Sequence, residues 1–429
     1  MRIIRIKKGN LGKRLKGLRG ETSLSDRRIE MSVRKIVESV RKNGDRALFE
    51  YTKKFDNVGL SPRTVKVSDK EFQDAETQVS DEIKSNLAIA AERIKDYHEK
   101  KLPREKTFTD SLGNELGWIL RPLQRVGVYV PGGKAAYPST VLMTVIPARV
   151  AGVEEVVLVT PCPNGEINPT VLVAAYMAGA SAVYKVGGAQ AIAALAFGTK
   201  SIPRVDKIVG PGNIYVAIAK KLVFGAVDID MIAGPSEVLV ISDGNVPAGW
   251  VASDLLAQAE HDEMAVPILV TNSSEFAEEV NREVSKRLKN LRRKNIAVEA
   301  VRNRGRIFVV DTLDDAISLS NAIAPEHLEL CVENPKALLP KVNHAGAIFL
   351  GSMSTEAFGD YVAGPSHVLP TGGAARFSSP LSVYDFLRMP SVISISEAGF
   401  RELADSVMNL AYTEGLEAHA LSVKVRLEK

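Results

Sequence analysis

Apolar positions along the first part of the chain recur with the spacing of amphipathic helices. Between residues 25 and 45, apolar side chains stand at positions 29, 33, 36, 37 and 40, and Gly44 follows as a helix-ending residue. A second helix is predicted by the stripe Ile83, Leu87, Ala91 and Ile94. We therefore expect about the first hundred residues to be mostly helical.

From about residue 118 the pattern changes to short apolar runs, each followed by a turn and a helical stretch. The first series consists of VGVYV, EEVVLV, SAVYKV and VDKIV, and the second of SEVLVIS, VPILVT, GRIFVVD, HLELCV and GAIFLG. Strands alternating with helices at this spacing are typical of doubly wound parallel sheets. The predicted fold class is α/β, with two Rossmann-like parallel-sheet domains, one inserted in the other, a helical N-terminal region and a C-terminal tail domain.

These patterns also suggest domain boundaries. We predict an N-terminal extension over 1–25, a split α/β domain over 26–127 and 237–379, an inserted α/β nucleotide-binding domain over 128–236, and a C-terminal tail over 380–429. Eight basic residues precede Glu21, the first acid, but this stretch has neither serine nor a long apolar core. We therefore interpret it as an ordered extension and not as a targeting peptide.

Composition narrows the classes of partner. No apolar run approaches the ~20 residues that a membrane helix requires, so we expect no membrane partner. The net charge of +4 over 429 residues is small, and no basic stripe is interleaved with aromatic residues, so nucleic acid is not an expected partner. The two cysteines, Cys162 and Cys331, exclude a disulfide framework and a CxxC metal site, which fits a reducing cytoplasm.

Three glycine turns follow predicted strands of the first series. They are YVPGGK (129–134), VGGAQA (186–191) and VGPGN (209–213), the last with the GxG spacing of Gly210 and Gly212. Turns at one edge of a parallel sheet suggest a cofactor crevice, although two glycines alone are a weak dinucleotide signal. Asp228 and Asp230 lie at the offset expected of a ribose-binding acid.

The chain has six histidines, and their contexts differ. His98 ends a helix beside lysines, which favours a surface position interacting with the helix dipole; His344 precedes a strand and is interpreted as structural. Gln258 and His261, spaced i,i+3, share a helix face and could bind one ion. Asp360 and His419 could add oxygen and nitrogen donors, a set without thiolate that suits zinc or manganese.

The segment APEHLEL places Glu326 and His327 next to each other at the start of a predicted strand. A carboxylate and an imidazole that approach one cleft are candidate general bases. On local grounds alone, exposed polar residues after a turn proline remain an equally simple interpretation.

Taken in order, these motifs resemble the histidinol dehydrogenase family. The resemblance runs from about residue 25 to the C-terminus and rests on VGVYVPGGKAAYPSTVLMTVIPA, KVGGAQAIAALAFGT, VDKIVGPGNIYVAIAK, DMIAGPSEVLVI, AQAEHD, APEHLEL, FGDYVAGPSHVLPT and EGLEAHA. It implies the last step of histidine biosynthesis, the four-electron oxidation of L-histidinol to L-histidine through bound L-histidinaldehyde, with reduction of two NAD⁺.

The resemblance also implies roles for individual residues. One Zn²⁺ per site would be held by Gln258, His261, Asp360 and His419, and the bases would be Glu326 and His327. Substrate contacts would come from Ser236, Gln258, His261, His327, Asp360, His367, Glu414 and His419, and NAD⁺ contacts from Tyr129, Gln190 and Asn213, so that Asn213 replaces Asp230 in the glycine turn. It further implies a cytoplasmic homodimer in which the tail of one subunit completes the site of the other.

Three other hypotheses remain. A paralogue would keep zinc, NAD⁺ and the Glu326–His327 pair but oxidise another polar alcohol, which Glu414 and His367 argue against. A metal-dependent hydrolase would turn over without NAD⁺ and leaves the glycine turns unexplained. A non-catalytic NAD-binding protein leaves the Glu326–His327 pair without a role. A thiohemiacetal route is disfavoured because neither cysteine has an evident basic partner.

Overall fold

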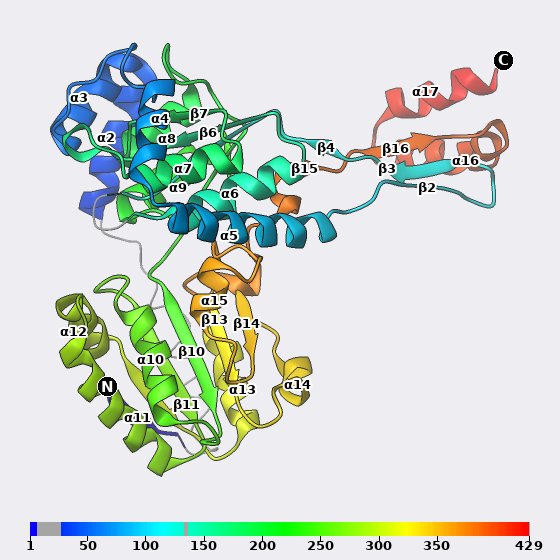
Figure 1. Cartoon of the computed structure of the whole chain (residues 1–429). Helices are drawn as coiled ribbons and strands as arrows, with labels where there is room; N and C mark the ends of the chain where they lie inside the picture. Colours follow the sequence, from blue (N-terminus) through cyan, green and yellow to red (C-terminus); the bar gives the residue numbers. More distant parts are fainter. Residues whose placement is uncertain (7–26, 133–135, 429) are drawn as a thin grey trace. The chain divides into compact units, whose positions relative to one another are not determined.

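The computed structural model describes residues 1–6, 27–132 and 136–428. The described residues fall into two compact units, one formed by Met1–Lys101 and Leu123–Phe386, the other by Leu102–Pro122 and Leu387–Lys429. Figure 1 labels the helices and strands of each unit. Within the described ranges, no helix combines the length and apolar character required to cross a membrane.

The first unit contains a five-stranded parallel sheet with the order β7-β6-β5-β8-β9. Its strands are β5 (Arg125–Tyr129), β6 (Glu155–Val159), β7 (Ala182–Tyr184), β8 (Lys207–Val209) and β9 (Asp228–Ile229), and its helices are α6 (Pro138–Val150), α7 (Pro169–Ala178), α8 (Gly188–Phe197) and α9 (Ile214–Val223). The predicted strand–turn–helix repeat is confirmed. The described parts of the three glycine turns, from residues 130, 185 and 210 onwards, follow β5, β7 and β8 and so lie at the carboxyl edge of this sheet.

In the described part of the chain, four helices precede this sheet: α2 (Arg27–Asn43), α3 (Asp45–Asp56), α4 (Asp69–Gln78) and α5 (Asp81–Lys100). The two helices predicted from the apolar stripes are confirmed as α2 and α5. Residues of α2 and α3 share a buried core with α8 and α9, whereas α4 packs on α7 and α5 on α6. The surface position predicted for His98 is wrong, because its side chain is fully buried in the last turn of α5.

The first unit also holds a six-stranded parallel sheet with the order β1-β12-β11-β10-β13-β14. Its strands are β1 (Arg2–Arg5), β10 (Glu237–Ser242), β11 (Val266–Thr271), β12 (Arg306–Val309), β13 (His327–Cys331) and β14 (Ala347–Leu350). The start of the predicted N-terminal extension is therefore an edge strand of this sheet, while the remainder, residues 7–25, lies outside the described residues.

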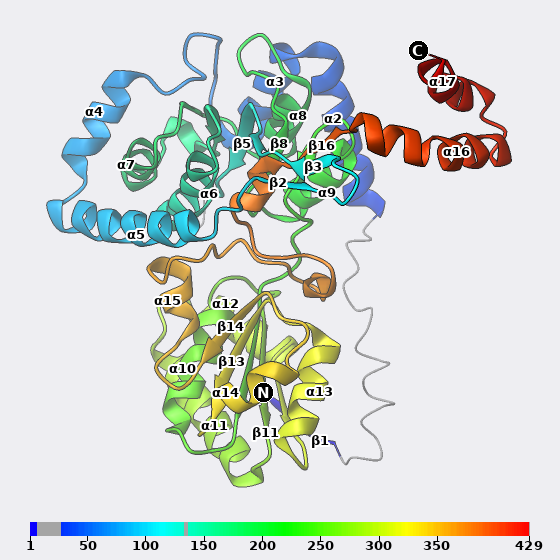
Figure 2. The same cartoon turned by 90° about the vertical axis from the view of Figure 1, so that its right-hand side faces the viewer.

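Helices cover both faces of the six-stranded sheet (Figure 2). Val238 and Val240 of β10 face a core shared with α10 (Ala248–Ala259), α11 (Ser274–Arg287) and α12 (Lys294–Asn303). Leu239 and Ile241 face the opposite core, shared with α13 (Leu313–Ile323) and α14 (Pro335–Leu338). Strands buried on both faces explain why the apolar runs are nearly continuous and not alternating. The predicted fold class is confirmed.

The second unit combines two stretches that are far apart in sequence. Its sheet pairs β2 (Lys106–Thr109), β3 (Glu115–Trp118) and β16 (Ser391–Ser394), β4 (Arg121–Pro122) pairs with β15 (Leu387–Arg388), and two helices follow, α16 (Glu397–Thr413) and α17 (Glu417–Leu427). The sequence predicted a tail over 380–429 but missed the contribution of residues 102–122. The four predicted domain boundaries otherwise stay a prediction.

Candidate active site

The candidate bases lie at the amino-terminal edge of the six-stranded sheet. Glu326 immediately precedes β13, His327 begins it, and Glu237 begins the neighbouring parallel strand β10. Gln258 and His261 lie at this same edge, because α10 starts after the carboxyl end of β10, runs back along the sheet and ends at Ala259. The short helix α15 (Glu356–Tyr361) adds Glu356 and Asp360, which are one turn apart and so share a helix face.

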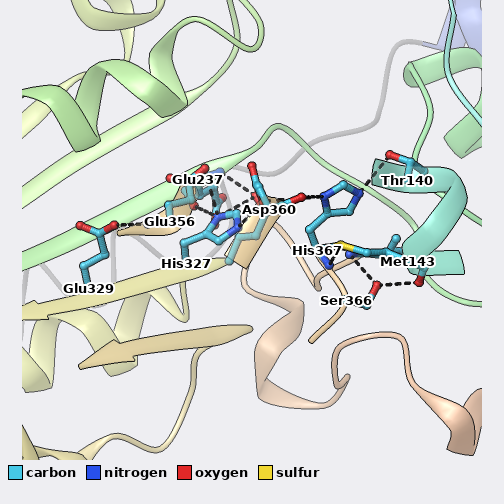
Figure 3. Close-up of polar contacts among 11 residues, drawn as sticks. Thr140, Met143, Glu237, His327, Glu329, Glu356, Asp360, Ser366 and His367 are labelled. Carbon is cyan, nitrogen blue, oxygen red and sulfur yellow. Dashed lines mark hydrogen bonds and ion pairs between the residues drawn. The ribbon is translucent and has the colours of Figure 1, made fainter. Parts of the chain in front are cut away.

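The neighbours of His327 fix the tautomer of its neutral imidazole ring. Its Nδ1 lies 3.0 Å from the backbone carbonyl oxygen of Glu237, and since a carbonyl only accepts, Nδ1 carries the proton. Its Nε2 is buried, has no hydrogen-bond partner among the described residues, and lies 3.9 Å from Oδ1 of Asp360. Burial lowers the pKa of His327, opposed by the nearby Asp360 carboxylate. The imidazole therefore presents an unprotonated nitrogen towards Asp360 (Figure 3).

Glu326 is buried beside this imidazole. Its Oε2 accepts a hydrogen bond from the backbone N–H of Glu237 at 2.8 Å and lies 3.8 Å from Nδ1 of His327. Burial raises the pKa of Glu326 well above its usual range, and the Glu237 and Asp360 carboxylates raise it further. A buried carboxylate with this increased proton affinity is suited to take a proton from a weak acid such as water.

A cluster of nitrogen and oxygen donors lies next to the bases. Donor atoms of His261, Glu356 and Asp360 lie within 4.8 Å of one another. In the amide orientation that its surroundings favour, the nitrogen of Gln258, a fully buried side chain, donates to Oε2 of Glu356 at 2.9 Å, so the amide oxygen is the atom that could bind an ion. The set contains imidazole, carboxylate and amide donors without thiolate, the donor types that suit a divalent ion such as zinc.

His367 connects this cluster to α6. Its Nδ1 lies 3.2 Å from the carbonyl oxygen of Asp360 and its Nε2 lies 3.0 Å from Oγ1 of Thr140. Because the carbonyl accepts the Nδ1 proton, Nε2 accepts the hydroxyl proton of Thr140. Burial lowers the pKa of His367. The ring is thus fixed near Asp360, as a contact residue of this site would be (Figure 3).

Several residues around the site escaped the sequence analysis. Glu356 could have been found from its i,i+4 spacing to Asp360, which places both acids on one face of a helix. Glu237 could not, since only the pairing of β10 with β13 brings it beside Glu326. Glu329 could have been found, because it lies two residues after His327 on β13 and so shares its sheet face; it accepts a hydrogen bond from the backbone N–H of Glu356 at 2.7 Å and shares a side-chain hydrogen bond with Asp254.

The residues assigned to NAD⁺ lie at the carboxyl edge of the five-stranded sheet. Tyr129 ends β5, and its hydroxyl accepts a hydrogen bond from the N–H of Gly188 at 3.1 Å. Gln190 is buried in the first turn of α8, and its Oε1 finds no partner within the described ranges. Asn213 is the N-cap of α9 and accepts hydrogen bonds from the N–H groups of Tyr215 and Val216. The turns after β5 and β7 are therefore joined, and Asn213 fixes the start of the helix after β8.

The remaining predicted site residues lie before β10, in the second unit, or in a buried ion pair. Ser236 is half-buried directly before β10, beside Glu237. Glu414 is the C-cap of α16 and His419 lies on α17, so both belong to the second unit, where they are exposed. Asp230, first considered as a ribose ligand, is buried and paired with Lys220.

Both cysteines are buried and their thiols are poor nucleophiles. Burial raises the pKa of Cys162 to about 12, and burial together with the Glu329 and Asp254 carboxylates raises that of Cys331. A thiolate is required for attack on an aldehyde. The structure therefore agrees with the interpretation that neither cysteine serves as a nucleophile.

Comparison with known proteins places the chain in a family. A model of the family described as histidinol dehydrogenase matches residues 19–427. Curated histidinol dehydrogenases from Aquifex aeolicus and Syntrophotalea carbinolica are 54% and 52% identical to it, over 99% and 100% of this chain and 99% of each relative. The crystal structure of histidinol dehydrogenase from Elizabethkingia anophelis superposes with a TM-score of 0.94 at 37% identity, covering 100% of this chain and 98% of that one. The chain therefore belongs to the histidinol dehydrogenase family, NAD-dependent oxidoreductases that catalyse the last step of histidine biosynthesis.

Proposed function

We propose that this chain oxidises L-histidinol to L-histidine in two successive hydride transfers to NAD⁺, with L-histidinaldehyde as the bound intermediate. The observation that carries the proposal is the unprotonated Nε2 of His327, which has no hydrogen-bond partner among the residues described and lies beside Asp360, with the Glu326 carboxylate next to the same ring. An alcohol-to-acid oxidation needs bases close to the same carbon atom. A proton leaves in each of the two oxidations, and a water molecule must lose a proton when it adds to the aldehyde between the two steps.

We propose one zinc ion per site, held by Gln258, His261, Asp360 and His419. Three of these residues lie at the amino-terminal edge of the six-stranded sheet, and the donors of His261 and Asp360 are already within 4.8 Å of each other. Zinc, when bound, would hold the imidazole and amino nitrogens of histidinol and so orient its alcohol carbon. Glu356 would support the site by fixing the Gln258 amide with its oxygen turned outward.

We assign NAD⁺ to the carboxyl edge of the five-stranded sheet, with contacts from Tyr129, Gln190 and Asn213. NAD⁺, when bound, accepts a hydride in each of the two oxidations. The edge suits a dinucleotide because doubly wound sheets bind nucleotides beyond the carboxyl ends of their strands, and α9 begins there with the positive end of its dipole.

The positions of the two bases suggest which of them takes each proton. In the first oxidation, Nε2 of His327 takes the hydroxyl proton as the hydride leaves the carbinol carbon. The ring then returns that proton to the carbonyl oxygen while Glu326 takes one from the water that adds to the aldehyde carbon. In the second oxidation the neutral His327 takes a hydroxyl proton from the hydrate as the second hydride leaves the same carbon, and the carboxylic acid is formed. Ser236, His367 and Glu414 would position the substrate during these steps.

We further propose a cytoplasmic homodimer with shared sites, in which Glu414 and His419 complete the partner's site. Both residues are exposed on the second unit. Apolar side chains are exposed on the same two helices, namely Leu403, Val407, Leu410, Leu421 and Val425. Exposed apolar residues grouped on one element suit burial against a second subunit.

The yield of NADH per mole of limiting L-histidinol tests the proposal, measured with zinc-loaded protein and excess NAD⁺. Two NADH with histidine as product is the expected result. One NADH would mean that the chemistry stops at the aldehyde, which removes the role given to Glu326. No NADH from folded, metallated protein would favour a paralogue that acts on another polar alcohol.

A further inference from the structure

A buried lysine–aspartate pair is hydrogen-bonded to Gly210, at the start of the glycine turn after β8. Nζ of Lys220, on α9, donates to the carbonyl oxygen of Gly210 at 3.0 Å. Oδ2 of Asp230, just after β9, accepts from the N–H of Gly210 at 2.7 Å, and its Oδ1 pairs with Lys220 Nζ. The side chains are 2% and 1% exposed, so neither can reach a ligand.

The backbone geometry of this turn explains why hydrogen bonds are needed to fix its conformation. Gly210 has φ of 110°, and a Cβ placed there would lie 2.1 Å from the carbonyl oxygen of Tyr129. Two residues on, a Cβ on Gly212 would lie 2.4 Å from Cγ1 of Val216. The two glycines lack a Cβ and so keep backbone freedom that hydrogen bonds must restrict, whereas the ring of Pro211 fixes its own φ.

Stability alone does not account for two charges at this place. Lys220 lies among the buried apolar residues of α9, Val216 to Ala219 and Val223. A buried ion pair often contributes no more to stability than well-packed apolar side chains of similar volume, whereas its fixed geometry can enforce one conformation. The pair contacts both the N–H and the carbonyl of one peptide, which apolar residues cannot do.

We propose that Lys220 and Asp230 are positioning residues for nucleotide binding, which hold the Gly210 peptide so that the turn and the N-terminus of α9 fit NAD⁺. This inference rests on the proposed NAD⁺ site at Tyr129, Gln190 and Asn213. It gives Asp230, a residue first considered for direct ribose contact, an indirect role through the main chain.

The test is NADH affinity, measured by fluorescence titration of the zinc-loaded protein, for Lys220→Met against a matched control. Lys207 of β8 provides the control. It is 8% exposed and ion-paired with Asp228 at 3.1 Å and Asp385 at 3.5 Å, but it begins the strand whose other end leads into Gly210. We expect Lys220→Met to weaken NADH binding about tenfold, the effect of losing one charged hydrogen bond, and Lys207→Met to leave it unchanged.

Steady-state kinetics separate positioning from general damage. Lys220→Met should raise KM for NAD⁺ and leave KM for histidinol and kcat at saturating NAD⁺ near wild type. The paired variant Lys220→Met/Asp230→Leu leaves no buried charge unpaired, so it should fold even if the single variant does not, and it should still bind NADH weakly.

Two results would overturn the inference: wild-type NADH affinity in the paired variant, or an equal loss in Lys207→Met. A wild-type protein that binds no NADH would instead refute the proposed nucleotide site itself. The two failures are therefore distinguishable.

Discussion

His327 shows how backbone contacts can define the chemistry of a side chain. Its Nδ1 proton is committed to the Glu237 carbonyl, so only Nε2 is free to accept a proton. The adjacency of Glu326 and His327 in the sequence predicted two bases, but not which ring nitrogen would act. That choice depends on β10, which is about ninety residues earlier in the chain and pairs with β13.

We expect His327→Ala to reduce turnover by about 10²–10⁴-fold, the usual contribution of a general base. Its zinc content should stay at the wild-type level, because His327 is not among the proposed ligands. Turnover with saturating histidinol and NAD⁺ and elemental analysis of the same samples check both statements. His344 is a half-buried histidine before β14, so His344→Ala is the matched control, and this variant should keep the wild-type activity. A His327→Ala enzyme with a near-normal rate would remove this residue from the mechanism.

Glu356 provides a second prediction at this scale. Its carboxylate accepts the hydrogen bond of the Gln258 amide, so it sets the direction of the amide oxygen. We expect Glu356→Ala to weaken zinc binding about 10–100-fold, the typical cost of losing a support of a metal ligand. Glu356→Gln keeps an oxygen acceptor and should lose much less. Competition with a chelator measures both affinities, and equal, wild-type affinity in the two variants would contradict the assignment.

Among the elements, helices and strands were predicted more fully than their surroundings. The stripes that predicted α2 and α5 and the apolar runs that predicted the central strands are local patterns, and they are confirmed. The strands β2 and β3 were missed because β2 is exposed throughout and β3 is at most half-buried, so that neither carries a clear apolar pattern. His98 was misplaced for a related reason: its lysine neighbours in sequence do not reveal which face of α5 is covered by α6.

The burial of His98 makes the stability of the α5 layer depend on pH. Burial, with a smaller effect of Lys101, lowers its pKa to about 4 from an ordinary 6.5, and both ring nitrogens lack partners in the described part of the chain. Below pH 6.5 the unfolded chain therefore binds a proton that the folded chain does not. Stability is highest above the ordinary pKa and decreases as the pH falls from about 6.5 towards 4.

His98→Leu should remove this dependence. From the shift, the wild type should lose on the order of 2 kcal/mol more than the variant between pH 7 and pH 4.5. Urea unfolding of both proteins at the two pH values measures the difference, and the other titrating groups cancel because both proteins contain them. An identical pH dependence in the two proteins would show that His98 is protonated equally in the folded and unfolded states.

At the scale of the whole molecule, the proposed site requires residues from both units. Gln258, His261, His327 and Asp360 belong to the first unit, and Glu414 and His419 to the second. The order of motifs in the sequence indicated that all of them serve one site. The family resemblance also implied that the tail comes from the partner subunit, although the order of motifs by itself carries no information on which copy of the tail is used.

Mixing two inactive variants distinguishes these arrangements. If the second unit of each subunit completes its partner's site, a heterodimer of His327→Ala and His419→Ala has one site with both defects and one site with none. Equal mixing of the unfolded chains followed by refolding makes half of the dimers mixed, so the activity should recover to about one quarter of that of wild type. If each chain supplies its own His419, every site keeps one defect and no activity appears. Refolding each variant alone is the control. Sedimentation of the wild type under assay conditions completes the test, since a fully active monomer would rule out shared sites.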